Sequence, residues 1–119
     1  MFLEADAKDL DVELASFECS ELPHPWRVVG DSAHTYDFTA AVLRFFATRF
    51  VPRDYMVVED GIVRDIPGEI YRRYEDGPNR AVSEFMEARA SVYEIAQGLC
   101  DLFGLNFTKN PGSYIRRSG

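Results

Sequence analysis

The spacing of apolar residues changes along the first half of the chain, and each change predicts an element. The run WRVVG at 26–30 is short, rich in β-branched residues and bounded by Pro25 and Asp31, which is typical of a strand. Residues 32–50 carry apolar side chains three and four positions apart, which predicts a helix ended by Pro52: Phe38, Ala41, Val42, Phe45 and Phe46.

A second apolar run, DYMVVED at 54–60, predicts a second strand. Its apolar residues, 55–58, are continuous, and continuous runs are typical of strands buried on both faces, as in parallel sheets. A strand, a helix and a strand of these lengths form a βαβ unit, whose crossover is right-handed in nearly all proteins. The first half therefore predicts an α/β fold with flanking helices.

The second half of the chain gives shorter patterns. Residues 61–78 are charged and interrupted by glycine and proline, which predicts a long loop of the kind that often forms a lid. Asn79 is placed to cap a helix from Arg80 to about Arg89. SVYEIA at 91–96 fits either a continuation of that helix or a short strand. The remaining predictions are a strand stub at 2–3, a helix at 10–17, a helical turn at 98–104, a last strand at 105–110 and a turn at 110–114.

Composition narrows the class of protein. A length of 119 residues fits one domain, and 46% hydrophobic residues are enough for a core. Acidic residues outnumber basic ones by 20 to 13, and the net charge of -7 argues against nucleic-acid binding and against docking on anionic membranes.

The sequence carries no membrane or export signal that we can identify. It has no apolar run near 18 residues, and its acidic N-terminus lacks the basic and apolar regions of a signal peptide. Cys19 and Cys100 are too few and too far apart for a metal knuckle or a disulfide framework, so they are expected to be reduced thiols. We therefore expect a cytoplasmic protein.

Candidate chemistry gathers where the two predicted strands end. Asp31 ends the first strand, and Glu59 and Asp60 end the second. Because neighbouring parallel strands deliver their C-terminal ends to one edge of the sheet, these three carboxylates should converge there, with His34 near them. Like charges brought together favour a bound cation, and oxygen ligands suit Mg²⁺ before Zn²⁺. The competing interpretation is that these are ordinary polar strand ends and a helix cap.

A phospho-acceptor receiver domain also clusters aspartates at strand ends. Such a domain needs an acidic pair at its first strand and a lysine at a late one. Here Asp9 and Asp11 fall in a predicted helix, and Lys109 is the only late lysine. The pattern therefore disfavours a receiver domain.

The motifs together resemble the cephalosporin hydroxylase family, which is built on a class I S-adenosylmethionine-dependent methyltransferase fold. The segments that carry the resemblance keep the family's order and approximate spacing over about residues 20–117: VVGDSAHTYDFTAAVLRFF, DYMVVEDGIV, YEDGPNRAVSEFM, LCDLFGLNFT and NPGSYIRR. The resemblance implies a Rossmann-like parallel sheet with flanking helices.

The resemblance also implies roles for the strand-end residues. The aspartate of its D-x-A-H motif and its E-D pair would hold Mg²⁺, which here are Asp31, Glu59 and Asp60. His34 matches the motif histidine, and it is the candidate catalytic residue, through a hydrogen bond to a metal ligand or a contact with substrate; a capping or packed histidine is the alternative. Magnesium would orient paired oxygens of the substrate and acidify a hydroxyl for methyl transfer.

One part of the family pattern is missing. A methyltransferase of this fold begins with a strand and a glycine-rich turn that holds the methionine moiety, and no G-x-G stretch precedes Asp31. We therefore interpret residues 1–119 as a single partial methyltransferase-like domain that resembles the family's C-terminal half. S-adenosylmethionine would bind only if the missing half were supplied.

Two functions from different classes follow. The first is an Mg²⁺-dependent O-methylation, or related modification, of a small-molecule substrate. The second is a non-catalytic remnant or subunit that folds by associating with itself or with a partner chain. A homo-oligomer or a complex with a second chain is expected in either case, because a sheet without its first strands exposes an edge.

Residues outside the predicted site also have alternatives. His24, between two prolines, is expected to be an exposed loop residue. Trp26 fits core packing, with adenine stacking as the functional alternative. Arg116 and Arg117 fit a solvated terminal pair, although they could also bind an acidic group.

Overall fold

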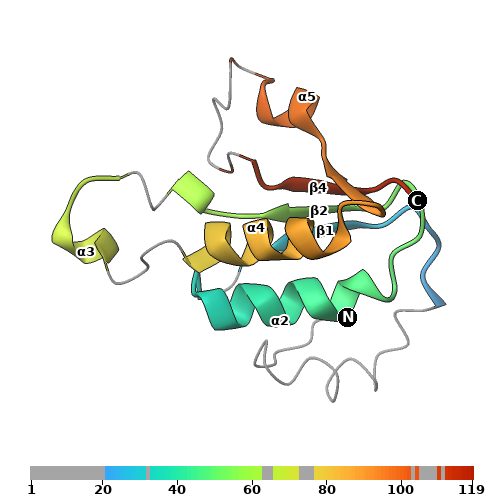
Figure 1. The fold of residues 1–119 in the computed structure, drawn as a ribbon, viewed down its shortest axis with the longest axis horizontal. Coiled ribbons are helices and arrows are strands. Elements are labelled where there is room, and N and C mark those ends of the chain that lie inside the picture. The colour runs from blue at the N-terminus through green and yellow to red at the C-terminus, as the bar shows by residue number, and fades with distance from the viewer. Residues whose placement is uncertain are drawn as a thin grey trace.

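The computed structural model describes residues 21–31, 33–62, 66–72, 77–102, 104, 110 and 112–119 (Figure 1). In these residues the elements, in chain order, are β1 (Arg27–Gly30), α2 (Tyr36–Ala47), β2 (Tyr55–Val58), α3 (Glu69–Arg72), α4 (Gly77–Arg89), β3 (Tyr93–Ile95), α5 (Gln97–Cys100) and β4 (Tyr114–Arg117). The predicted elements at 2–3 and 10–17 lie outside the described residues, as does nearly all of the predicted strand at 105–110.

The strands form one mixed sheet in the order β1-β2-β4-β3. β1 and β2 are parallel, whereas β4 is antiparallel to both β2 and β3. The predicted α/β fold with flanking helices is confirmed, but only the β1–β2 pair has the expected parallel arrangement. The stretch at 91–96, which fitted either a helix or a strand, contains β3.

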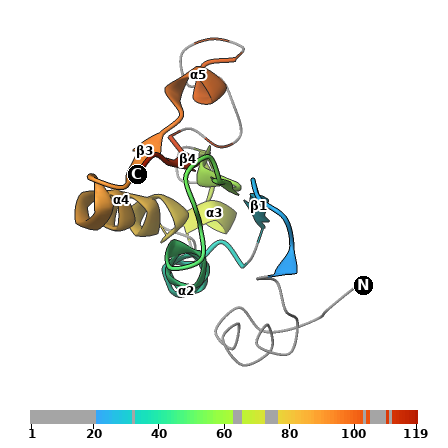
Figure 2. The ribbon, with the colours of Figure 1, turned by 90° about the vertical axis from the view of Figure 1, so that its right-hand side faces the viewer.

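The two long helices cover the same face of the sheet. Figure 2 shows α2 and α4 side by side with the strands on one side of them. The buried core lies in this layer, and its members include Leu43, Met56, Phe85 and Ile115. Along β2 burial alternates, with Met56 and Val58 buried and Tyr55 and Val57 half-buried. The continuous apolar run therefore does not mark a strand equally buried on both faces.

Helix α4 begins earlier than the sequence predicts, at Gly77 instead of Arg80. A Cβ at Gly77 would lie 2.9 Å from the Tyr36 nitrogen and 3.0 Å from the His34 oxygen, so only glycine fits where α4 meets the start of α2. Pro78 is tolerated in the first turn of a helix, where its missing N–H has no helical partner. The prediction that Asn79 caps the helix is therefore wrong.

A buried carboxylate fixes the start of the sheet. Asp54 is fully buried, and it accepts hydrogen bonds from the backbone N–H of Trp26 at 2.7 Å and of Val51 at 2.7 Å. The Nδ1 of His24 lies 2.8 Å from its Oδ2, and the His24 ring stacks on Trp26. His24 is thus exposed as a residue, as expected, but its ring is bound to the core, and Trp26 belongs to the core itself.

The described residues test some of the shorter predictions from the sequence. The predicted helical turn at 98–104 overlaps α5, which begins one residue earlier, and Gly104 then donates its N–H to the oxygen of Asp101. Cys100 is buried and free. Within the described part of the chain, no helix has the length and hydrophobicity needed to cross a membrane.

Candidate functional site

The parallel pairing of β1 and β2 brings the two predicted groups of acidic residues to one edge of the sheet. Gly30, the last residue of β1, is in register with Val58, the last residue of β2. The N–H of Glu59 donates to the oxygen of Gly30 at 3.1 Å, which extends the pairing one residue further. Asp31 and Asp60 therefore follow directly from two strands whose ends are held together.

Three side chains meet at this edge. Asp31, His34 and Asp60 each offer a ligand atom, and these atoms all lie within 4.8 Å of one another. The Nε2 of His34 is 3.5 Å from Oδ2 of Asp60. Asp31 is exposed, whereas His34 and Asp60 are half-buried, so the group opens to solvent on the Asp31 side. We call these three residues the strand-end group.

Glu59 is half-buried at the same edge, but the strand-end group found among the described residues does not include it. Its role as a metal ligand stays a prediction, as do those of Asp31 and Asp60. The role of His34 also stays a prediction, and the N-cap residue of α2 is its neighbour Thr35.

The backbone at two members of the strand-end group is unusual. His34 has a φ of 54° and Asp60 a φ of 56°, both in the left-handed region. This region is uncommon for residues other than glycine, although Asn, Asp and His enter it more often than most. Such conformations persist where surrounding contacts hold them, and they concentrate at functional sites.

Contacts around Asp60 supply that support. Its N–H donates to Oδ1 of Asn110 at 2.9 Å, so the loop before β4 holds the end of β2. The next residue, Gly61, is buried, and a Cβ there would lie 2.8 Å from Oδ1 of Asn79. Nδ2 of Asn79 donates to the oxygen of Gly61 at 2.6 Å. Asn79, interpreted from the sequence as a helix cap, thus holds the loop that positions Asp60.

The helices that carry this edge are joined at the surface. The Tyr36 hydroxyl, at the start of α2, donates to the Glu84 carboxylate on α4. This hydrogen bond is the main reason why the pKa of Tyr36 is raised and the pKa of Glu84 is lowered, and a hydrogen bond from Arg80 lowers the Glu84 pKa further. The contact fixes α2 two residues beyond His34.

Sequence reasoning missed the residues that support the group. The Asn79 side chain donates a hydrogen bond to the backbone oxygen of Gly61, and the Asn110 side chain accepts one from the backbone N–H of Asp60. Oγ of Ser113 lies 3.3 Å from the place that a Cβ on Gly61 would occupy. The two hydrogen bonds join positions 18 and 50 residues apart, and Ser113 is further still from Gly61 in the chain, so local sequence patterns could not predict them. The one available signal was Gly61 itself, because a glycine directly after a strand-end Glu-Asp pair suggests a close approach as well as a turn.

The donor set suits a divalent cation. Two carboxylates supply hard oxygen ligands for Mg²⁺ or Mn²⁺, and an imidazole is a good ligand for Mn²⁺ and other transition metals. With Mg²⁺, His34 would instead serve as the hydrogen-bond partner of Asp60. The open Asp31 side leaves space for water or for oxygens of a substrate.

Comparison with known proteins places the chain in a family. No curated protein and no solved structure gives a significant match. The family model described as rhamnosyl O-methyltransferase/CmcI matches residues 11–118. This match includes β1, β2 and every residue of the strand-end group, and the four-stranded mixed sheet with its helices is consistent with part of a methyltransferase fold. Because the match covers most of its length, the chain belongs to the rhamnosyl O-methyltransferase/CmcI family.

Proposed function

We propose that the chain takes part in divalent-metal-dependent transfer of a methyl group to a hydroxyl of a small molecule. The observation that carries the proposal is the strand-end group, in which three potential ligand atoms lie within 4.8 Å of one another at the edge where β1 and β2 end. Family membership adds methyltransferase-like chemistry in general terms. The substrate is not specified by these residues beyond the hydroxyl that the chemistry requires.

In this proposal Asp31 and Asp60 hold Mg²⁺ or Mn²⁺, and Glu59 is a further candidate ligand. A divalent cation in such a site binds adjacent substrate oxygens and makes a hydroxyl more acidic. His34 lies close enough to Asp60 to contact a substrate hydroxyl at the same site, where it can accept the proton that the hydroxyl loses. The hydrogen bond from the Asp60 N–H to Asn110 holds the backbone of this loop in the position from which Asp60 faces His34.

S-adenosylmethionine is the methyl donor that the family implies. The glycine-rich turn expected to bind its methionine moiety has no counterpart among residues 1–30, which contain no G-x-G. The residues of this chain therefore fit the metal side of the reaction better than the donor side. We assign no donor contact to them, and we expect the 119-residue chain alone to bind the donor weakly in calorimetric titration.

The test is transfer of label from methyl-labelled S-adenosylmethionine to a panel of hydroxylated small molecules, with and without Mg²⁺. With the donor in large excess, to offset its weak binding, we expect metal-dependent transfer that Asp60→Asn removes. Glu87→Gln, which changes an exposed carboxylate on α4, is the matched control and should leave transfer unchanged. Metal binding without any label transfer would contradict a catalytic role for this chain on its own.

The alternative function is a non-catalytic subunit that acts by association. The observation in its favour is β1, which forms one edge of the described sheet and exposes 59% of Val29. Exposed strand edges pair readily with other chains. An oligomer that forms equally well with Asp60→Asn and shows no label transfer would support this alternative.

A further inference from the structure

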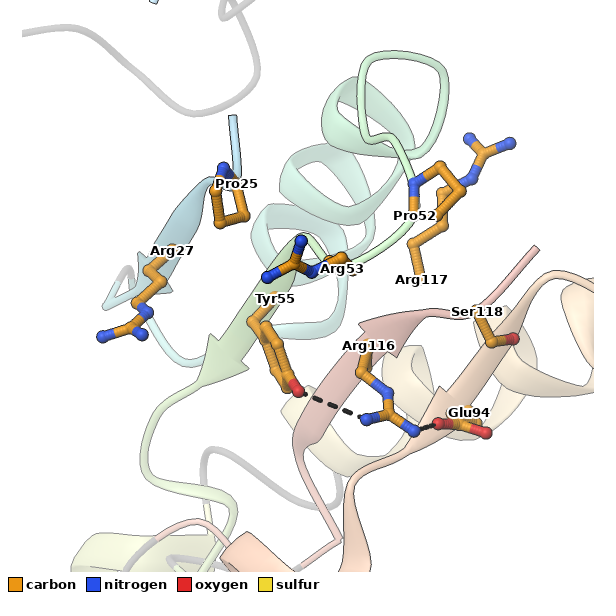
Figure 3. Close-up of a pocket in the computed structure, with 9 residues that line it drawn as sticks. All are labelled: Pro25, Arg27, Pro52, Arg53, Tyr55, Glu94, Arg116, Arg117 and Ser118. Carbon is orange, nitrogen blue, oxygen red and sulfur yellow. Dashed lines mark hydrogen bonds and ion pairs between the residues drawn. The ribbon is translucent and has the colours of Figure 1, made fainter. Parts of the chain in front are cut away.

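A hollow lined by arginines lies at the opposite end of the sheet from the strand-end group. It has a volume of about 460 Å³ and is lined by Pro25, Arg27, Pro52, Arg53, Tyr55, Glu94, Arg116, Arg117 and Ser118 (Figure 3). We call it the arginine hollow. Its volume falls within the range of roughly 300–1,000 Å³ that is common for small-molecule sites.

The register of the sheet builds the floor of this hollow. Arg27 pairs with Tyr55, Tyr55 with Arg116, and Arg116 with Glu94, so these four residues form one row across all four strands. Residues in one such row point to the same face. The neighbouring row contains Met56 and Ile115, which are buried in the core that α2 and α4 cover, so the arginine row points away from that core.

The charges of the hollow do not cancel. Arg116 forms an ion pair with Glu94 and donates to the Tyr55 hydroxyl at 3.4 Å. Arg117 alternates with Arg116 and is in register with the buried Tyr93, so its side chain lies on the face that the helices cover, where it donates to the Phe50 oxygen. Within the described part of the chain, the guanidinium groups of Arg27 and Arg53 have no hydrogen-bond or ion-pair partner. The lining thus carries two arginines without a partner among the described residues, Arg27 and Arg53, in a protein whose net charge is -7.

The backbone of Arg53 has a conformation that is uncommon for residues other than glycine. Its φ is 83°, in the left-handed region, and its N–H donates to the oxygen of Arg117 at 3.0 Å. Glycine or asparagine would occupy this position with less strain. In Figure 3 the Arg53 side chain extends above Tyr55 toward the β1 side of the hollow. The turn before β2 thus carries an arginine at a position where glycine would cause less backbone strain.

We propose that the arginine hollow binds a small molecule bearing a phosphate group. Guanidinium groups bind phosphate oxygens through paired, charge-assisted hydrogen bonds. A phosphate monoester carries about two negative charges near neutral pH, which balances two unpartnered guanidinium groups better than a single carboxylate does. The rings of Pro25, Pro52 and Tyr55 supply apolar surface for the organic part of the ligand.

This site is separate from the proposed metal site. Arg27 begins β1 and Asp31 follows its end, so about four residues at roughly 3.3 Å each, some 13 Å, separate the two. A ligand in the arginine hollow therefore binds in addition to a substrate at the strand-end group. The two proposals can fail independently.

The experiment uses inorganic pyrophosphate as the probe on the whole chain, in metal-free buffer at ionic strength held constant with sodium chloride. Trp26, the single tryptophan, lies between the lining residues Pro25 and Arg27, so its fluorescence reports binding, and calorimetry provides a second readout. We expect saturable binding that the double variant Arg27→Gln/Arg53→Gln weakens by at least about tenfold, because each lost charge-assisted contact is worth about that factor.

Two control variants make the result specific. Arg44→Gln removes an exposed arginine on α2, on the other side of the sheet, and should change the affinity by less than about twofold, since distant exposed charges are screened. Asp60→Asn should leave pyrophosphate binding intact. The proposal is overturned if neither readout detects saturable binding to the parent, or if Arg44→Gln weakens binding as much as the double variant.

Discussion

Nε2 of His34 lies 3.5 Å from Oδ2 of Asp60, although the two residues follow different strands and are 26 positions apart in the chain. The parallel register of β1 and β2 brings their loops together, and both residues take left-handed backbone conformations. On one side Gly77 packs so closely that a Cβ there would lie 3.0 Å from the oxygen of His34. On the other side the Asn110 side chain accepts a hydrogen bond from the N–H of Asp60. The pair is therefore positioned by segments that are themselves far apart in sequence.

The first prediction concerns metal binding at the strand-end group. We expect Mg²⁺ or Mn²⁺ to bind with a dissociation constant on the order of millimolar, because few protein ligands are available and water must fill the other positions. At about ten times that concentration the fold should gain about 1.4 kcal/mol, which raises the melting temperature by several degrees. Thermal unfolding followed by circular dichroism over a metal titration measures this shift.

Three substitutions test which residues bind the metal. Asp31→Asn and Asp60→Asn should each abolish the metal-dependent rise, and either one is expected to stabilise the metal-free chain slightly by reducing repulsion between carboxylates. Glu59→Gln separates the two possible ligand sets, since it removes the rise only if Glu59 binds the ion. Glu87→Gln is the control. Equal responses to magnesium in the parent and in all the variants would refute a site at this edge.

Local patterns in the sequence were sufficient for the elements that form the site. The β-branched run at 26–30, the helical spacing at 32–50 and the apolar run at 54–60 each predicted an element that the structure contains, at Arg27–Gly30, Tyr36–Ala47 and Tyr55–Val58. Together with the rule that parallel strands end at one edge, they predicted that Asp31, Glu59 and Asp60 converge. Asp31 and Asp60 lie together as predicted, whereas the strand-end group does not include Glu59. This inference needs only short-range periodicity and one general property of parallel sheets.

The features that sequence patterns did not predict depend on contacts between distant segments. The strand Tyr114–Arg117 inserts antiparallel between β2 and β3, and neither its insertion nor its direction follows from its own four residues. Likewise, the contact between His24 and Asp54 joins positions 30 residues apart. Helix α4 begins at Gly77, where the chain passes close to His34. The capping pattern at Asn79 gives no sign of this contact.

The second prediction concerns the buried carboxylate of Asp54. Asp54→Asn would replace one acceptor oxygen with an NH₂ group facing a backbone N–H, that of Trp26 or of Val51. Losing a charge-assisted hydrogen bond and leaving a donor unsatisfied in a buried site should cost about 2–4 kcal/mol of unfolding free energy. Urea denaturation measures the change, and Asp101→Asn, at a partly exposed position, should cost less than about 0.5 kcal/mol. Comparable losses in the two variants would count against this role.

The third prediction concerns the hydroxyl of Tyr93. This buried side chain donates to the oxygen of Ala47 at 2.9 Å, where α2 ends and its carbonyls lack helical partners. Tyr93→Phe should therefore cost about 1 kcal/mol of unfolding free energy near neutral pH. Denaturant unfolding at pH 7 measures this loss, and no loss would mean that water replaces the hydroxyl at Ala47.

The same residue predicts a pH dependence. Burial raises the pKa of Tyr93 above its ordinary value of 10.0, an effect that Arg117 partly offsets. Above about pH 10 the unfolded chain loses this proton before the folded chain does, so the stability of the parent should fall as the pH rises through that window. Tyr93→Phe should show a shallower fall between pH 9.5 and about 11. Identical slopes in the two proteins would show that Tyr93 titrates alike in both states.

The last prediction concerns association through β1. Val29 is 59% exposed on a strand that forms an edge of the described sheet, so a second chain can pair with that edge and cover the valine, whose full burial is worth about 1.5–3 kcal/mol. We expect light scattering after size-exclusion chromatography to give a mass above the monomer value of 13.6 kDa. Val29→Lys should shift the protein toward the monomer, because charged residues on an edge strand oppose pairing. Ile70→Lys, at a residue 63% exposed on α3, places the same charge away from the edge and should leave the mass unchanged. A parent that is monomeric at tens of micromolar, or an Ile70→Lys variant that dissociates as readily as Val29→Lys, would exclude β1 as the associating edge.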